Sequence, residues 1–294
     1  MTTEIAAKEK RKIALTSVIA AVFLASFKLV IGTITGSLGI LSEALHSGLD
    51  LLAALITLFA IRYADKPADS DHNYGHGKIE NYSALLETIL LLITCVWIIY
   101  EAIKRLITGK VEIDITIWSF IVILTSIIID FSRSRALYKV ARRHNSQALE
   151  ADALHFSTDI WSSFVVLAGL IGASFHFYSA DSIAALVVAV IVLLVSYRLG
   201  KRSFDILMDK APEGLKERIA SIIRDIPEVI KFHDIRVREG GPFIFVELNI
   251  HVDKKLNIDE AHKISHKVER SILQKIENIQ VTVHIEPEVE KEQL

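Results

Sequence analysis

Long apolar stretches separated by short polar ones fill the first 200 residues of the chain. A helix needs about 20 apolar residues to cross a bilayer, and six of these stretches are long enough to do so. We therefore expect six transmembrane helices, at residues 13–34, 38–63, 82–107, 115–137, 150–175 and 181–200.

The pattern changes after Pro212, where apolar residues follow shorter helical and strand periods. The predicted elements are a helix at 213–226, strands at 232–239 and 242–253 joined by a turn at Gly240–Gly241, a helix at 257–276 and a strand at 279–287. The second helix has Asn257 or Asp259 as its candidate cap. This αββαβ order predicts a small α+β domain with its helices on one face of a sheet. We divide the chain into a membrane domain at 1–209 and a soluble domain at 210–294.

Composition supports a membrane protein and excludes several other classes. The chain is 51% hydrophobic with a mean hydropathy of +0.40, too apolar for an ordinary soluble protein. Its net charge of −2 gives no sign of a nucleic-acid partner. Cys95 is the one cysteine, so neither an internal disulfide nor a thiolate-rich metal site is possible.

The loops on one side of the expected membrane domain hold nearly all of its basic residues. They are the N-terminus with Lys8, Lys10, Arg11 and Lys12, the loop after the second span with Arg62, Lys66 and Lys78, and the segment after the fourth with Arg133, Arg135, Lys139, Arg142 and Arg143. The third and fourth spans are joined by a segment with Lys110 alone. Since positive loops stay in the cytoplasm, we expect both termini there.

Ionisable residues lie inside the second and fifth spans, where a bilayer penalises them. His46 and Asp50 are four residues apart, as are His155 and Asp159, so each pair lies on one face of its helix. Two imidazoles and two carboxylates suit a tetrahedral Zn²⁺ ion. The alternative is interhelical hydrogen bonding without a metal.

Other polar residues in the spans are not predicted to be ligands. Glu43 is either a neighbour of the proposed metal site or a residue at a helix end. Asp152 is expected near the membrane surface. Lys28 and Glu87 lie in other spans, where they could pair with each other or extend toward the interface, and Asp130 is expected to serve the cytoplasmic end of the fourth span.

Two further groups of histidines lie outside the spans. The loop after the second span carries Asp69, Asp71, His72 and His76, which suit a surface Zn²⁺ site or belong to a solvated loop. The soluble domain carries His233, His251, His262, His266, His284 and Glu286, which are either a site assembled by the fold or scattered surface residues.

These stretches together resemble the cation diffusion facilitator family, specifically its bacterial zinc transporters. "GSLGILSEALHSGLD" is similar to the family's second span, "HNYGHGKIE" to the start of its third and "EADALHFSTD" to its fifth. The resemblance implies a six-helix transport domain, a cytoplasmic ferredoxin-like domain that binds metal and dimerises, and a homodimer in the lipid bilayer.

The resemblance also implies roles for particular residues. His46, Asp50, His155 and Asp159 match the transport site, and Asp69, His72 and His76 match a second site in the loop. His233, His262 and His284 match a binuclear site at the dimer interface. Asn249 and Glu286 depart from the family's histidine and aspartate, and His251 is the candidate substitute. Lys78 and Asp209 match a pair that ties the protomers together.

The expected function is Zn²⁺ export from the cytoplasm in exchange for protons, by alternating access and without enzymatic chemistry. Protons compete with metal because imidazole and carboxylate bind metal only when deprotonated. The ligand set also admits Fe²⁺, Co²⁺, Ni²⁺ or Cd²⁺. A metalloenzyme needs an open coordination position, which four protein ligands would close. A metal sensor or scaffold on the same fold is the remaining alternative.

Overall fold

The computed structural model describes residues 2–108, 117–174, 179–241 and 243–288. The chain forms two compact units. The helical unit comprises residues 1–67 and 79–204, and the α/β unit comprises residues 68–78 and 205–294. Lys110, Pro242 and the first two residues of the expected span at 115–137 lie outside the described residues.

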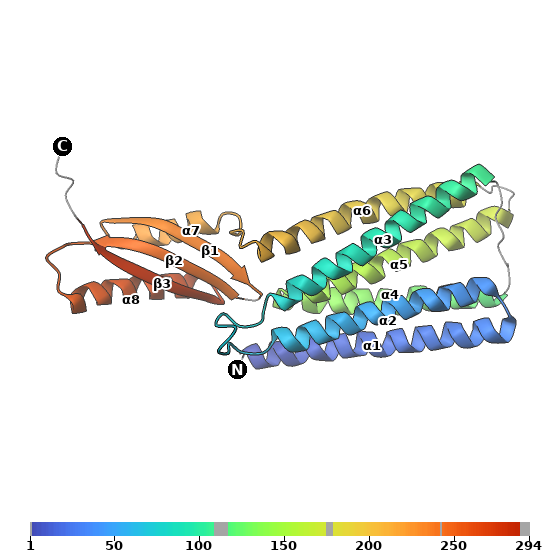
Figure 1. Cartoon of the computed structure of the whole chain (residues 1–294), viewed down its shortest axis with the longest axis horizontal. Helices are drawn as coiled ribbons and strands as arrows, with labels where there is room; N and C mark the ends of the chain where they lie inside the picture. Colours follow the sequence, from blue (N-terminus) through green and yellow to red (C-terminus); the bar gives the residue numbers. More distant parts are fainter. Residues whose placement is uncertain (1, 109–116, 175–178, 242, 289–294) are drawn as a thin grey trace. The chain divides into compact units, whose positions relative to one another are not determined.

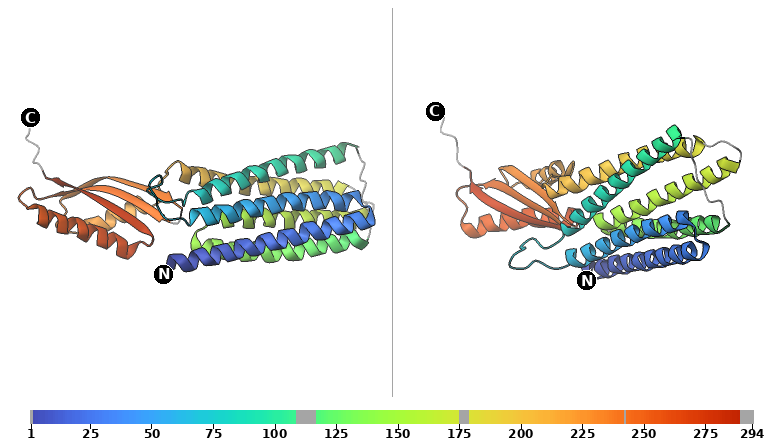
Figure 2. Two further views of the ribbon diagram at one scale, coloured as in Figure 1. Left: turned by 60° about the horizontal axis from the view of Figure 1, so that its bottom comes forward. Right: turned by 45° about the vertical axis from the view of Figure 1, so that its right-hand side comes forward.

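Six long helices run alongside one another in the helical unit (Figures 1 and 2). They are α1 (Thr2–Thr35), α2 (Leu38–Ala64), α3 (Ile79–Thr108), α4 (Ile117–His144), α5 (Gln147–Ser174) and α6 (Ser179–Leu207). Each corresponds to one expected span, which confirms the six-helix prediction. Within the described residues, α1 to α4 have both the length and the apolar composition to cross a membrane.

Most of the helices extend beyond their apolar stretches because charged residues at the ends find partners. α1 begins eleven residues before the predicted span at 13–34. In this extension the Lys10 ammonium lies 2.8 Å from Asp65 Oδ1 and 2.8 Å from Glu80 Oε1. Ser146 donates a hydrogen bond to Glu80 as well. These contacts join α1 to the start of α3 and to the ends of α2 and α4, so a charged segment stays helical and buried.

Helix packing brings the two polar spans together. α1 packs against α2 and α4, and α5 packs against α4, α3 and α2. A buried cluster that includes Leu58, Leu137 and Phe156 fills the space among α2, α4 and α5. Ala84, Ala151 and Leu199 join α3, α5 and α6. Ala84 and Ala151 are small, so they let the backbones of α3 and α5 approach closely.

The α/β unit has the predicted αββαβ order. Its elements are α7 (Leu215–Arg224), β1 (Lys231–Gly240), β2 (Phe243–Val252), α8 (Ile258–Lys275) and β3 (Ile279–Pro287). β1 and β2 form the predicted antiparallel hairpin, and β3 pairs with β2 in parallel after the α8 crossover. Asn257 caps α8 in a capping box with Glu260, so Asn257 and not Asp259 is the cap.

The two faces of this sheet have different roles. α7 and α8 pack on the face formed by Val246, Leu248 and Ile250, each at most 1% exposed. The alternate residues of β2, among them Asn249 and His251, point to the other face. The periodicity of two therefore separates a hydrophobic core from a face that carries histidines.

Candidate metal centres

α2 and α5 bring the four ionisable residues of the second and fifth spans into one cluster. His155 Nε2 lies 3.1 Å from Asp50 Oδ1 and 3.7 Å from Asp159 Oδ2. His46 Nε2 lies 3.6 Å from Asp159 Oδ1 and 3.8 Å from Asp50 Oδ1. Each imidazole therefore faces both carboxylates, and the four residues alternate around a ring. We call this ring the membrane cluster.

The membrane cluster is mostly shielded. The side chains of His155, Asp50 and Asp159 are 8%, 12% and 13% exposed, whereas that of His46 is 33% exposed. Asp159 Oδ2 is buried and has no hydrogen-bond partner. Buried carboxylate oxygens are normally satisfied by donors or cations. Two imidazoles, two carboxylates and an oxygen without a partner fit a divalent cation.

Charged and hydroxyl residues surround the membrane cluster. Lys28 pairs with Glu43 at 3.1 Å and not with Glu87, which accepts hydrogen bonds from Thr57 and Ser83. Glu43 therefore has a cationic partner on α1 of its own.

A second group of polar residues links α1, α4 and α5. Arg133 lies 3.3 Å from Asp130 and donates to Ser17 at 3.1 Å, and Ser17 donates to Asp152 at 3.2 Å. Asp152, expected near the membrane surface, has a side chain that is completely buried within the protein. α1 covers it and supplies the hydroxyl that its burial requires.

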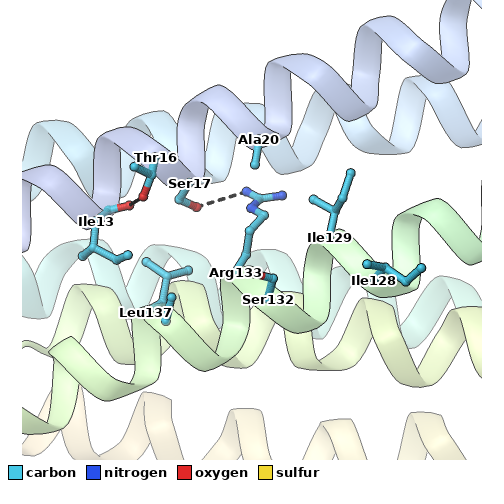
Figure 3. Close-up of a pocket in the computed structure, with 10 residues that line it drawn as sticks. Ile13, Thr16, Ser17, Ala20, Ile128, Ile129, Ser132, Arg133 and Leu137 are labelled. Atoms are coloured by element: carbon cyan, nitrogen blue, oxygen red, sulfur yellow. Dashed lines mark hydrogen bonds between the residues drawn. The ribbon is translucent and has the colours of Figure 1, made fainter.

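A pocket of about 370 Å³ lies between α1 and α4 (Figure 3). Its lining is largely apolar, with residues such as Ile13, Ile129 and Leu137. Arg133 reaches across it to Ser17, as Figure 3 shows. None of the four residues of the membrane cluster lines it. The pocket is therefore separate from that cluster.

The loop between α2 and α3 brings Asp69, His72 and His76 together as predicted. Asp69 Oδ1 lies 3.2 Å from His72 Nδ1, and Asp69 Oδ2 lies 3.3 Å from His76 Nε2. His76 is buried, whereas the other two are exposed. Asp71 is exposed and does not belong to this group. We call the three residues the loop cluster.

Backbone hydrogen bonds preorganise the loop cluster. Asp69 Oδ1 accepts the N–H groups of His72 at 2.7 Å and Asp71 at 3.1 Å. The His72 N–H is the main reason that the pKa of the Asp69 carboxyl lies below its ordinary value, and the His72 ring lowers it further. Gly77 packs against the β1–β2 turn so tightly that a Cβ there would lie 2.5 Å from the Gly240 oxygen. The aspartate is thus charged and fixed next to two imidazoles.

A third group lies on the open face of the sheet. His233 Nε2 lies 3.0 Å from His251 Nε2, and Glu286 Oε2 lies 3.4 and 3.3 Å from these two atoms. Three potential ligand atoms therefore converge from β1, β2 and β3. We call His233, His251 and Glu286 the sheet cluster.

Two neighbours contact the sheet cluster. Asn249 donates a hydrogen bond to Glu286 Oε1 at 3.0 Å and so orients that carboxylate. Glu288 Oε2 lies 2.9 Å from His251 Nδ1, without hydrogen-bond geometry. Sequence reasoning did not identify Glu288, although its alternation with Glu286 along the strand was the available signal.

Of the other predicted histidines of this unit, His262 and His266 lie apart from the sheet cluster within one protomer, whereas His284 lies beside it. His262 is on α8, which packs on the opposite face, and its ring contacts that of His266 at 4.3 Å. His284 is exposed, with Nε2 3.8 Å from Glu286 Oε1. Lys78 and Asp209 form an ion pair at 2.7 Å within the α/β unit. The role of this pair between protomers stays a prediction.

Comparisons with known proteins cover both units. Residues 14–208 match the family described as the cation efflux transmembrane domain, and residues 211–288 match the cation efflux protein cytoplasmic domain. The cation-efflux pump FieF of Yersinia enterocolitica is 31% identical over 258 residues, which cover 86% of this chain and 84% of the pump. The FieF pump of Citrobacter koseri is 30% identical over 278 residues, or 92% and 91% of the two chains.

Similar solved structures include isolated C-terminal domains. One is described as the metal-bound C-terminal domain of the CzcD transporter from Thermotoga maritima, with 31% identity, 25% of this chain and 86% of that chain covered, and a TM-score of 0.24. The family patterns and the full-length relatives carry the assignment. The chain belongs to the cation diffusion facilitator, or cation efflux, family, whose members are multi-pass membrane transporters of divalent metals and not enzymes.

Proposed function

We propose that the protein exports Zn²⁺ from the cytoplasm in exchange for protons, with His46, Asp50, His155 and Asp159 holding the transported ion. The observation that carries this proposal is the ring of two imidazoles and two carboxylates between α2 and α5. A sensor would gain nothing from placing its ligands inside membrane helices, where their desolvation is costly. A transporter requires them there.

Zinc is favoured by the ligand set. Two imidazoles and two carboxylates match tetrahedral Zn²⁺, whereas Mg²⁺ and Ca²⁺ prefer sites made of oxygen alone. Fe²⁺, Co²⁺, Ni²⁺ and Cd²⁺ remain the competing substrates because they accept the same ligands.

Proton coupling follows from the chemistry of these ligands. Metal binding requires the imidazoles to be neutral and the carboxylates to be ionised, so metal and protons exclude each other. A pH gradient across the membrane then loads the site from the more alkaline side and empties it to the more acidic side. No covalent step is involved.

The two ends of the helical unit differ in a way that supports alternating access. His46, near the beginning of α2, is the most exposed residue of the membrane cluster. At the other end of α2, Asp65 takes part with Lys10 and Glu80 in a buried ion cluster. In the proposed cycle, this cluster closes the cytoplasmic route in the present conformation and separates when the site opens to the cytoplasm.

The proposed setting is the inner membrane of the cell, with both termini cytoplasmic and two protomers per transporter. The basic residues at the start of α1 and the end of α4 support this orientation. The loop and sheet clusters are proposed as accessory zinc sites, because each combines imidazoles and a carboxylate within a few ångströms.

The test is metal uptake into proteoliposomes with an acidic lumen. Zn²⁺ is expected to accumulate, and to do so faster than Fe²⁺, Co²⁺, Ni²⁺ or Cd²⁺. Asp159→Asn removes a charged ligand with little change in shape, and it is expected to reduce zinc flux at least about 100-fold, since loss of a charged buried partner costs about 3 kcal/mol or more. Asp71→Asn, an exposed aspartate outside the loop cluster, is the matched control and should transport normally. Equal flux in wild type and Asp159→Asn would contradict the proposal.

A further inference from the structure

Two carboxyl groups in the helical unit are completely buried and are not part of the membrane cluster. Glu87 is on α3 and Asp152 is on α5, and both have no exposed surface. Asp152 lies one turn before His155 on the same helix. The helix of Glu87, α3, packs against both α2 and α5, which carry the membrane cluster. Glu87 is therefore close to the helices of that cluster without being a ligand in it.

The hydrogen-bond partners of Glu87 among the described residues are hydroxyl groups. Thr57 of α2 and Ser83 of α3 both donate to Oε1, whereas Oε2 has no partner. Among the described residues, no lysine or arginine pairs with Glu87, in contrast to Asp130, which has Arg133. An ionised carboxylate is costly in such a place, so the neutral, protonated form is favoured in this conformation.

Glu87 lies on a polar face of α3 that leads to the cytoplasmic end. Glu80, Ser83 and Glu87 are spaced by three and four residues, so they lie along one side of the helix. Glu80 belongs to the buried ion cluster with Lys10 and accepts a hydrogen bond from Ser146. Acidic groups thus occur at three levels: the membrane cluster, Glu87 with Asp152, and Glu80.

Two residues near this face also have buried polar atoms without a hydrogen-bond partner. Among the described residues they are Asn81, the next residue after Glu80 on α3, and Asp152, whose helix α5 packs against α3. Buried polar groups are satisfied by protein or by ordered water, so these atoms are candidates for binding water. Water and carboxyl groups together can make a hydrogen-bonded path.

We propose that Glu87 carries protons between the membrane cluster and the cytoplasmic end, with Asp152 as the link on the side of the cluster. This inference rests on the proposed proton exchange. A proton that has displaced the metal passes to the Asp152 carboxylate, which then releases it toward Glu87. Protonated Glu87 passes its proton to water on the cytoplasmic side and takes up the next one. Only O–H bonds form and break, so no other reactant is needed.

A path for the metal itself is a weaker explanation of the same residues. Neither Glu87 nor Asp152 lines the pocket between α1 and α4, and both side chains are completely buried. A hydrated divalent ion needs space, whereas a proton needs only a chain of hydrogen bonds. A purely structural acid is the other alternative, and glutamine would serve that purpose as well, because its amide oxygen can accept from Thr57 and Ser83.

The experiment compares wild type, Glu87→Gln and Glu87→Asp in proteoliposomes by two assays. The first is exchange of labelled against unlabelled Zn²⁺ at equal pH on both sides, which needs no net proton movement. The second is Zn²⁺ accumulation driven by an acidic lumen. Glu87→Gln is expected to retain the exchange but to lose gradient-driven accumulation by about 100-fold, the lower end of what a positioned proton-transfer group contributes. Glu87→Asp, which restores a titratable group, should recover part of it.

Thr88→Val is the matched control, because Thr88 is the next residue on α3, is also buried, and donates only to a backbone carbonyl. It should perform both assays like the wild type. Gradient-driven accumulation by Glu87→Gln at the wild-type rate would overturn the inference. Loss of both assays in Glu87→Gln and Glu87→Asp would also overturn it, in favour of a structural role. A wild type that exchanges zinc but ignores the gradient would instead overturn the proposed proton exchange.

Discussion

Replacing an imidazole of the membrane cluster by a carboxylate is expected to change which metal ions the cluster binds. Imidazole is a neutral ligand with one available nitrogen, and carboxylate is a charged ligand that binds through one or two oxygens. His46 is the most exposed of the four residues. Its side chain can therefore be replaced with less disturbance of the packing than that of His155.

His46→Asp is predicted to weaken discrimination against Cd²⁺. Three carboxylates tolerate a larger ion and a higher coordination number than the two that the ring now has. The measurement is the ratio of Cd²⁺ to Zn²⁺ flux in both proteins at the same pH gradient, and the ratio should rise. An unchanged ratio with zinc flux retained would show that His46 does not contact the ion.

The four residues of the membrane cluster could be predicted from sequence because their spacing fixes their side of the helix. His46 and Asp50 share a face wherever the helix packs, and so do His155 and Asp159. The surroundings of Glu87 could not be predicted in this way. Its burial depends on Thr57, which is on another helix, and no pattern in α3 gives that contact.

At the scale of single elements, the loop cluster depends on one short turn. Asp69 accepts two backbone N–H groups, and its charged form accepts them more strongly than a neutral carboxyl does. Its pKa is lowered from 3.8, chiefly by the His72 N–H. A carboxyl with a lowered pKa stabilises the folded loop above its unfolded pKa, and this stabilisation is lost as the pH falls through the lower, folded value.

The turn is therefore predicted to persist in metal-free protein from neutral pH down to about pH 4, the ordinary value for aspartate, and to loosen below it. Amide hydrogen exchange at His72 measures this directly. Asp69→Ala, which removes the accepting oxygen, should show fast exchange across the whole range. A turn that already opens in the wild type at pH 6 would contradict the assignment of Asp69 as its organiser.

The alternation of side chains along a strand predicts the face on which a residue of the sheet cluster lies, but not its partners. The period of two correctly placed Asn249 and His251 on the face opposite the core. It could not determine which histidines meet, because that depends on the register of the strands and on a bulge in β1 between His233 and Arg236. The same limit applies to His262, whose distance from the sheet cluster follows from α8 packing on the other face.

His251→Ala is predicted to lower the number of zinc ions bound per protomer by about one, because it removes one of three converging ligand atoms. Equilibrium dialysis of the full-length protein with Zn²⁺ gives this number. His262→Ala serves as the comparison and should bind as the wild type does. The reverse result would favour the ligand set implied by the family resemblance, in which His262 takes part across a dimer interface.

At the scale of the whole molecule, the apolar pattern predicted the six helices but not their ends. Transmembrane length is set by the bilayer, so each span is visible as a run of apolar residues. The helix ends depend on pairings between elements far apart in sequence, such as Lys10 with Glu80. Such pairings keep charged turns helical, and the sequence of one helix contains only half of each pair.

The account as a whole depends on the metal ion lying between α2 and α5. Zinc-edge anomalous diffraction from crystals of the zinc-loaded protein, compared with Asp50→Asn crystals grown in the same way, measures this directly. We predict an anomalous peak within about 2.0–2.2 Å of ligand atoms of His46, Asp50, His155 and Asp159, which disappears in Asp50→Asn. Zinc peaks at the loop and sheet clusters with none between α2 and α5 in the wild type would contradict the account.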